Sequence, residues 1–197
     1  MSFKLFGTKI YISFLFAATL CLMLIFDRTG LALPTLFAIF IHETAHLFTM
    51  WALDCAPKQI RLIPASVQIV SDFSAGYNRD IAVSVMGPLS NFLLFGCLYL
   101  NHLRYGNQGS LVYALLNLII GVFNLLPVTG LDGGRILYSL LAKRQDPNRA
   151  NLILKIVTLI FAAAALFLAV TLTIRGKLNL SLYIIALYLV VISILKT

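Results

Sequence analysis

Charged residues are scarce in this sequence, and their scarcity restricts the solvent in which the chain can fold. Lys, Arg, Asp and Glu make up 11% of the 197 residues, whereas soluble domains carry roughly 25%. Hydrophobic residues make up 60%, and the mean hydropathy is +0.95. A water-soluble core cannot cover that much apolar surface, so we expect an integral membrane protein.

Cysteines are also few, and they are widely spaced. Cys21, Cys55 and Cys97 lie too far apart in the sequence for a metal cluster, and their odd number argues against a disulfide framework. The net charge is +8, but the basic residues are spread over short loops and form no patch. Nucleic acid is therefore not an expected partner, and the charge is explained by anionic lipid headgroups of the bilayer.

Six hydrophobic runs dominate the sequence, and all but one have about the 20 residues needed to cross the hydrocarbon of a bilayer. They cover residues 9–26, 31–53, 81–100, 110–141, 152–174 and 178–195. The run at 110–141 is too long for one crossing and contains PVTGLDGG, so we predict a helix broken inside the membrane. The predicted fold class is an all-α polytopic membrane protein with six transmembrane helices. The β-branched segment QIRLIPASVQIVSD predicts one short β-hairpin at the membrane surface, between the second and third helices.

Basic residues are distributed unequally between the two sides of such a protein. One side carries ten of them: Lys4, Lys9, Lys58, Arg61, Arg79, Lys143, Arg144, Arg149, Lys155 and Lys196. The other side carries four: Arg28, Arg104, Arg175 and Lys177. The positive-inside rule then predicts that both termini are cytoplasmic, in a multi-pass protein of a bacterial cytoplasmic-type membrane.

The only glutamate and two of the three histidines lie within five positions of the second hydrophobic run, in HETAH at 42–46. Ionisable side chains near the bilayer centre are costly and by default mark a functional site. His42 and His46 are four residues apart, so a helix places them on one face. HExxH on a helix is a zinc signature, in which Glu43 acts as general base. The alternative is a pair of buried, hydrogen-bonded histidines with Glu43 as their counter-ion.

A third metal ligand is expected, because catalytic zinc sites usually have three protein ligands and leave the fourth position to water. Five of the six aspartates fall in loops or at span ends, where a solvated charge or a helix cap accounts for them. Asp132 alone lies inside a hydrophobic segment, in the interrupted run, where a proline and several glycines allow close approach of the backbone. We therefore predict one zinc ion per chain, bound by His42, His46 and Asp132.

Three motifs together resemble the site-2 protease family of intramembrane zinc metalloproteases. They are HETAH at 42–46, MGPLSN at 86–91 and NLLPVTGLDGG at 124–134, in the order and spacing of that family. The resemblance covers nearly the whole chain and is closest to the sporulation-type branch, which cleaves the pro-sequence of a sporulation sigma factor. It implies that His42, His46 and Asp132 bind zinc and that Glu43 is the catalytic base.

The resemblance also implies a catalytic role for Asn124, in positioning the substrate or stabilising the oxyanion. A buried amide beside an unwound helix can equally cap freed backbone groups, so both roles of Asn124 stay open. Asn91 is interpreted as structural, and Gly87-Pro88 as a closely packed helix start with proline in the first turn.

The implied partners are a membrane-associated protein substrate, with a sigma-factor precursor as its expected form, and a membrane-protein regulator. The predicted hairpin can add a strand to an unfolded substrate, or it can be a packing loop. The sequence shows neither a PDZ domain nor a cystathionine-synthase-type regulatory domain, so we expect a single transmembrane metalloprotease domain over residues 1–197.

Two other classes of function remain. A membrane metal transporter would also place histidines and an aspartate in its spans, but more often with acidic or histidine-rich loops and a path of polar residues. An inactive substrate-binding scaffold would be expected to have lost Glu43 or a ligand. Neither pattern is present in the sequence, so an intramembrane zinc metalloendopeptidase is favoured.

Overall fold

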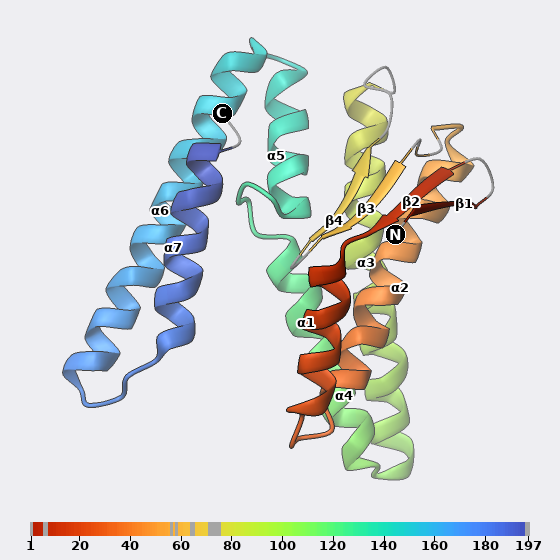
Figure 1. Ribbon diagram of the computed structural model, residues 1–197, viewed down its shortest axis with the longest axis vertical. Helices are drawn as coiled ribbons and strands as arrows, with labels where there is room; N and C mark the ends of the chain where they lie inside the picture. Colours follow the sequence, from red (N-terminus) through yellow and green to blue (C-terminus); the bar gives the residue numbers. More distant parts are fainter. Residues whose placement is uncertain are drawn as a thin grey trace. The chain divides into compact units, whose positions relative to one another are not determined.

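The computed structural model describes residues 2–5, 8–55, 57, 59–63, 66–70 and 76–195. Seven helices and four strands are present among these residues (Figure 1). The chain divides into two compact units, Met1–Val122 and Phe123–Thr197, which are described one at a time. Helices make up most of both units, as the sequence predicts.

The first unit contains three complete helices and a four-stranded sheet. Its helices are α1 (Phe14–Ile25), α2 (Ala32–Ala52), α3 (Tyr77–Tyr105) and most of α4 (Gln108–Asn124). Its strands are β1 (Ser2–Leu5), β2 (Thr8–Ile12), β3 (Gln59–Ile63) and β4 (Ser66–Val70), in the spatial order β1-β2-β3-β4. Strands β3 and β4 fall in the predicted hairpin segment and pair antiparallel, with Gln59 opposite Val70. Residues 64–65, the predicted turn, lie outside the described residues.

The sheet is larger than the predicted hairpin, because the chain begins with two further strands. The helix predicted over residues 9–26 begins only at Phe14, and Thr8–Ile12 form β2 instead. This stretch, TKIYI, is rich in β-branched and aromatic residues, which favour extended backbone. Strand β2 pairs antiparallel with β1 and parallel with β3, which satisfies its backbone groups on both sides.

Asp27 shapes the short turn between α1 and α2. Its carboxylate accepts hydrogen bonds from the backbone N–H groups of Ala32 at 2.9 Å, Thr29 at 2.9 Å and Gly30 at 3.0 Å. These bonds, with that of Ala32 the strongest, hold the pKa of Asp27 below its ordinary value. Ala32 opens α2, so the carboxylate satisfies one of the donors that a helix start leaves unpaired.

Helix α3 begins earlier than predicted, and this changes the environment of its proline. The sequence predicts a span over 81–100 with Gly87-Pro88 at the start of the helix, but α3 runs from Tyr77, so Pro88 lies inside it. That interpretation of Gly87-Pro88 is therefore wrong. Pro88 has no N–H to donate to the carbonyl of Ser84, and its ring crowds that turn of the helix. The early start comes from a polar first turn that hydropathy does not detect, in which the carbonyl of Gly76 accepts from the backbone N–H groups of Arg79 and Asp80.

The predicted interruption of the fourth run is confirmed. Helix α4 ends at Asn124, residues 125–131 are irregular, and α5 (Asp132–Ala142) begins at the aspartate. The second unit continues with α6 (Pro147–Ile174) and α7 (Leu180–Leu195), which pack against each other (Figure 1). Its apolar core is built from Val128 of the irregular segment, Ala162 of α6 and Leu189 of α7.

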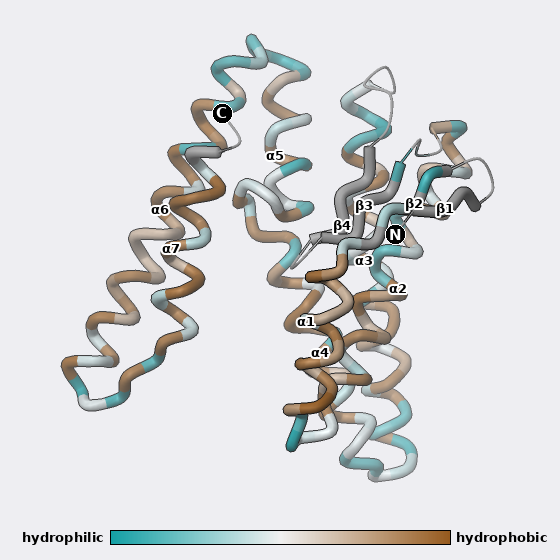
Figure 2. Tube along the Cα trace, viewed as in Figure 1, coloured by the Kyte–Doolittle hydropathy of each residue, from teal (hydrophilic) through white to brown (hydrophobic). Residues whose placement is uncertain are grey.

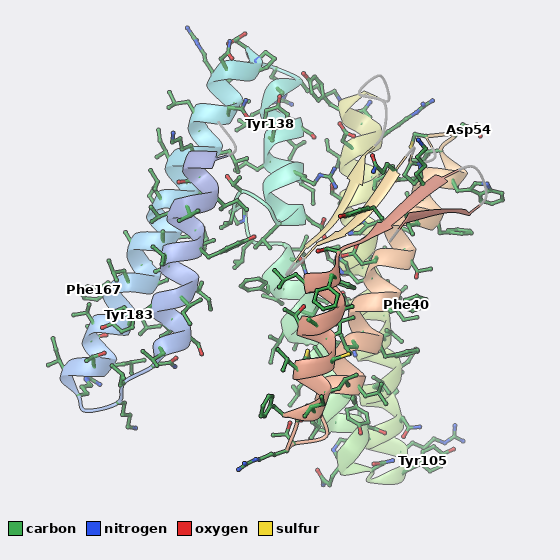
Figure 3. All side chains as sticks on the ribbon, in the orientation of Figure 1. Phe40, Asp54, Tyr105, Tyr138, Phe167 and Tyr183 are labelled. Atoms are coloured by element: carbon green, nitrogen blue, oxygen red, sulfur yellow. The ribbon has the colours of Figure 1, made fainter. Side chains whose placement is uncertain are left out.

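Both units are apolar outside and have small or polar residues inside. The buried apolar residues are mostly alanines, and several polar residues are buried as well, among them Asn91, Asn117 and Thr158. Large apolar side chains point outward instead: Phe40 is 64% exposed and Phe167 72% (Figure 3). Hydrophobic residues follow one another along α1, α6 and α7, with hydrophilic residues at helix ends (Figure 2). This arrangement is typical of helices that pack in lipid.

Two of the described helices, Tyr77–Tyr105 and Pro147–Ile174, are long and apolar enough to cross a membrane by length and composition. Three shorter apolar helices accompany them: Phe14–Ile25, Gln108–Asn124 and Leu180–Ser193. Helix length and the exposed apolar surface thus agree with an integral membrane protein.

Candidate metal centre

The two histidines of HETAH lie on the buried face of α2. His42 and His46 are each 4% exposed, whereas Phe48 and Trp51 on the same helix are more than half exposed. The imidazole rings stand edge to face, with centroids 4.7 Å apart. Spacing by one helical turn therefore brings both rings to one place inside the first unit.

Partners from α3 fix the protonation of both rings. Nδ1 of His46 lies 2.7 Å from the carbonyl oxygen of Val83, and Nδ1 of His42 lies 2.6 Å from Oδ1 of Asn91. Both oxygens can only accept a hydrogen bond, so each Nδ1 carries the proton. In the neutral rings, Nε2 is then the nitrogen with the lone pair, which is the form that binds a metal.

The two Nε2 atoms converge, with 3.1 Å between them. Two histidine nitrogens at zinc–nitrogen distances of 2.0–2.1 Å in tetrahedral geometry lie about 3.3 Å apart. Two acceptor nitrogens that face each other at this distance repel unless both lone pairs bind a cation. The donor set therefore fits a zinc ion.

Gly87 leaves the space in front of the rings open. A Cβ built on this residue would overlap Nε2 and Cε1 of His46 and would lie 2.7 Å from Nε2 of His42. Any side chain at position 87 would thus occupy the place to which both nitrogens point. Glycine at this position of α3 lets that helix approach α2 closely without filling the space in front of the rings.

Glu43 and Asn124, the two predicted catalytic residues, are half-buried. Glu43 lies on α2 directly after His42. Asn124 is the last residue of α4, where the helix gives way to the irregular segment. Both make interactions within the protein.

Asp132 belongs to the second unit, where it opens α5 and is buried, with 8% of its surface exposed. The two glycines after it allow the irregular segment to fold back over the helix start. A Cβ on Gly133 would overlap the carbonyl of Leu125, and one on Gly134 would overlap the carbonyl of Val128. The sequence DGG is therefore required for this close backbone approach, and it fixes where the aspartate begins its helix.

The irregular segment is also held from α6. The backbone N–H of Thr129 donates to Oγ1 of Thr158 at 2.9 Å, and the hydroxyl groups of the two residues lie 2.9 Å apart. Thr158 is fully buried and donates its own proton to the carbonyl of Leu154 at 2.8 Å. This contact ties the segment before Asp132 to the longest helix of the second unit.

Sequence reasoning missed the residues that support the histidines. It interpreted Asn91 as structural, and it assigned nothing to Asn117 or Val83. A signal was available for the two asparagines: an amide inside an apolar helix is costly to bury unless it is hydrogen-bonded, so each needed a partner. Val83 acts through its backbone carbonyl and left no signal.

A buried pair of metal-competent histidines in a helical, lipid-facing fold defines a candidate membrane metal centre. Comparison with known proteins specifies the class. The chain matches Peptidase family M50 over residues 108–168, which include α4, the irregular segment and α5. A site-2 protease structure from Methanocaldococcus jannaschii has the same fold, with a TM-score of 0.72, 22% identity, and coverage of 98% of this chain and 94% of that one.

Two curated relatives agree with this match. A zinc metalloprotease of Methanocaldococcus jannaschii is 29% identical over 112 residues, which are 54% of this chain and 33% of that protein. The stage IV sporulation protein FB of Bacillus subtilis is 30% identical over 146 residues, 68% of this chain and 45% of that protein. The chain thus spans less than half the length of these relatives. The resemblance to the site-2 protease family, which the three motifs indicate, is confirmed.

Proposed function

We propose that this protein is an intramembrane zinc metalloprotease that hydrolyses a peptide bond of a membrane-associated protein. The observation that carries the proposal is the histidine pair, whose Nε2 atoms converge at 3.1 Å with both Nδ1 protons directed to fixed acceptors. The match to Peptidase family M50 and the zinc metalloprotease among the relatives support the same chemistry.

One zinc ion per chain is bound, in this proposal, by His42, His46 and Asp132. A carboxylate and two imidazoles are a common catalytic zinc set, with one position left for water. When bound, zinc supplies a Lewis acid that polarises the peptide carbonyl and activates water. We propose that residues 1–197 are a single transmembrane metalloprotease domain.

Glu43 is the proposed general base. It accepts a proton from the attacking water and then delivers it to the leaving amine, so one carboxylate serves both halves of the reaction. Its place beside His42 on α2, half-buried, suits a group that must meet both water and substrate. Asn124 is proposed to position the substrate or stabilise the oxyanion, because its amide lies where α4 ends and the backbone becomes irregular.

The proposed substrate is a membrane-associated sigma-factor precursor. A membrane-protein regulator is a further proposed partner. The similarity to a sporulation protein of Bacillus subtilis supports this choice. The substrate must unwind locally before cleavage, because the carbonyls of an intact helix are hydrogen-bonded and shielded.

We further propose six membrane spans, with both termini and the β3–β4 hairpin on the cytoplasmic side. The parallel pairing of β2 with β3 supports this topology, because it places the segment before α1 beside the segment after α2. Cysteine substitution of Gly76 and of Gly30 in a chain without native cysteines tests it. An impermeant thiol reagent outside intact cells should label position 30 and spare position 76, and the reverse result would invert the topology.

Cleavage of a co-expressed, membrane-tethered sigma-factor precursor tests the enzymatic proposal. We expect the wild type to cleave it and Glu43→Gln to lose activity by at least about 10²-fold, since general acid–base groups contribute 10²–10⁴-fold. Glu43→Gln preserves shape, so its zinc content should equal that of the wild type. Wild-type turnover in Glu43→Gln would contradict the assigned role of Glu43.

A further inference from the structure

We infer that Asn117 of α4 is a positioning residue for the proposed zinc ligand His42, acting through Asn91 of α3. The inference rests on the proposed function, because it requires His42 to bind the metal. It assigns a role to a residue that lies outside all three sequence motifs.

A continuous chain of hydrogen bonds joins α4 to the histidine. Nδ2 of Asn117 donates to the carbonyl of Tyr113 at 2.9 Å, and Oδ1 of Asn117 accepts from Nδ2 of Asn91 at 3.1 Å. Asn91 donates from the same nitrogen to the carbonyl of Ala38 at 3.3 Å. Its Oδ1 then faces Nδ1 of His42 at 2.6 Å.

The backbone carbonyls that this series of hydrogen bonds meets fix the direction of every bond in it. The carbonyls of Tyr113 and Ala38 only accept, so the amide nitrogens of Asn117 and Asn91 must face them. Asn117 therefore presents its oxygen to Asn91, and Asn91 presents its oxygen to the ring of His42. The proton of His42 is thereby placed on Nδ1, which leaves the lone pair on Nε2 for the metal.

Burial makes the arrangement stiff. Asn91 is 0% and Asn117 5% exposed, so reversing either amide would bury mismatched polar groups. A second polar contact between the same two helices is only partly buried. Ser110 donates to Oδ1 of the exposed Asn101 at 3.0 Å, away from the histidines. Partners that orient a metal-binding histidine typically change metal affinity or activity by 10–100-fold when removed.

The test compares Asn117→Leu with Asn101→Leu in the full chain purified in detergent. Zinc affinity is measured by chelator competition, and the ligand field by the visible spectrum of the Co²⁺-substituted protein. We expect Asn117→Leu to bind zinc about tenfold more weakly and to shift the Co²⁺ spectrum. Asn101→Leu should match the wild type in both measurements.

A double-mutant cycle separates positioning from packing. Asn91→Leu removes the link between Asn117 and the ring of His42. Asn117→Leu should then no longer weaken zinc binding in the Asn91→Leu background. An equal loss in both backgrounds would mean that Asn117 only packs, and this would overturn the inference.

Two further outcomes are decisive. Wild-type protein that binds no zinc would overturn the proposed function, whereas unchanged zinc affinity in Asn117→Leu would overturn this inference alone. If Asn117→Leu does not give folded protein, the smaller Asn117→Ala enters the same cycle and is judged by the same results.

Discussion

The two units of the chain support their proposed zinc ligands in different ways. In the first unit, His42 and His46 are held by polar groups 49 and 37 residues further along the sequence, on α3. In the second unit, Asp132 is placed by its own neighbours, because Gly133 and Gly134 fit against carbonyls of residues 125 and 128. The two proposed histidine ligands thus depend on distant hydrogen bonds, and the proposed aspartate ligand depends on local backbone packing.

This difference predicts how the histidines and the aspartate respond to substitutions around them. Hydrogen bonds to the histidines decide which nitrogen carries the lone pair, so disturbing them should alter metal binding directly. Packing around the irregular segment decides where α5 begins, so disturbing it should first lower stability and only then affect the metal. Substitutions that retain all three proposed ligands can test the two units separately.

The largest effect is expected from Gly87→Ala. Its new Cβ would lie where the Nε2 atoms of His42 and His46 converge, so the variant should lose nearly all of its zinc although every ligand remains. Zinc per chain, measured by elemental analysis of purified protein, checks this expectation. Gly96→Ala is the matched control, because it lies on the same helix and its Cβ would meet nothing within 4 Å.

A Gly87→Ala protein that is folded and retains one zinc per chain would show that the metal does not bind in the space in front of His42 and His46 that Gly87 leaves open. Equal zinc loss in Gly96→Ala would show that the effect comes from α3 as a whole. Either result would remove the fit of the first unit to a zinc site.

A smaller effect is expected from Thr158→Val in the second unit. This change retains the shape but removes the hydroxyl that accepts from the N–H of Thr129, which costs about 1–3 kcal/mol when a buried donor is left unpaired. The apparent Tm should fall by several degrees, with a partial loss of activity and near-normal zinc content. Thr171→Val is the control, because that hydroxyl donates to the carbonyl of Leu168 on its own helix.

Equal Tm values for Thr158→Val and the wild type would contradict the role of α6 in holding the irregular segment. Complete zinc loss in Thr158→Val would break the contrast between the units, because the second unit would then be as sensitive to hydrogen bonding as the first.

Local features of the site could be predicted from the sequence, and distant ones could not. The spacing of His42 and His46 and the interruption before Asp132 are readable because each depends on a few consecutive residues. The N-terminal sheet was missed because Thr8–Ile12 continues a hydrophobic run, and the pairing of β2 with β3 lies about 50 residues away in the sequence. The position of Pro88 inside α3 was missed because hydropathy places the start of a span at its apolar edge and does not detect a polar first turn.

Zinc content decides whether the three proposed ligands bind one metal, when it is measured in the wild type, His46→Ala and Asp132→Ala, because the two variants remove one proposed ligand from each unit. We expect about one zinc per chain in the wild type and little in either variant, with peptide cleavage lost in both. Full zinc and full cleavage in Asp132→Ala would contradict this expectation, because the third ligand would then have to lie elsewhere.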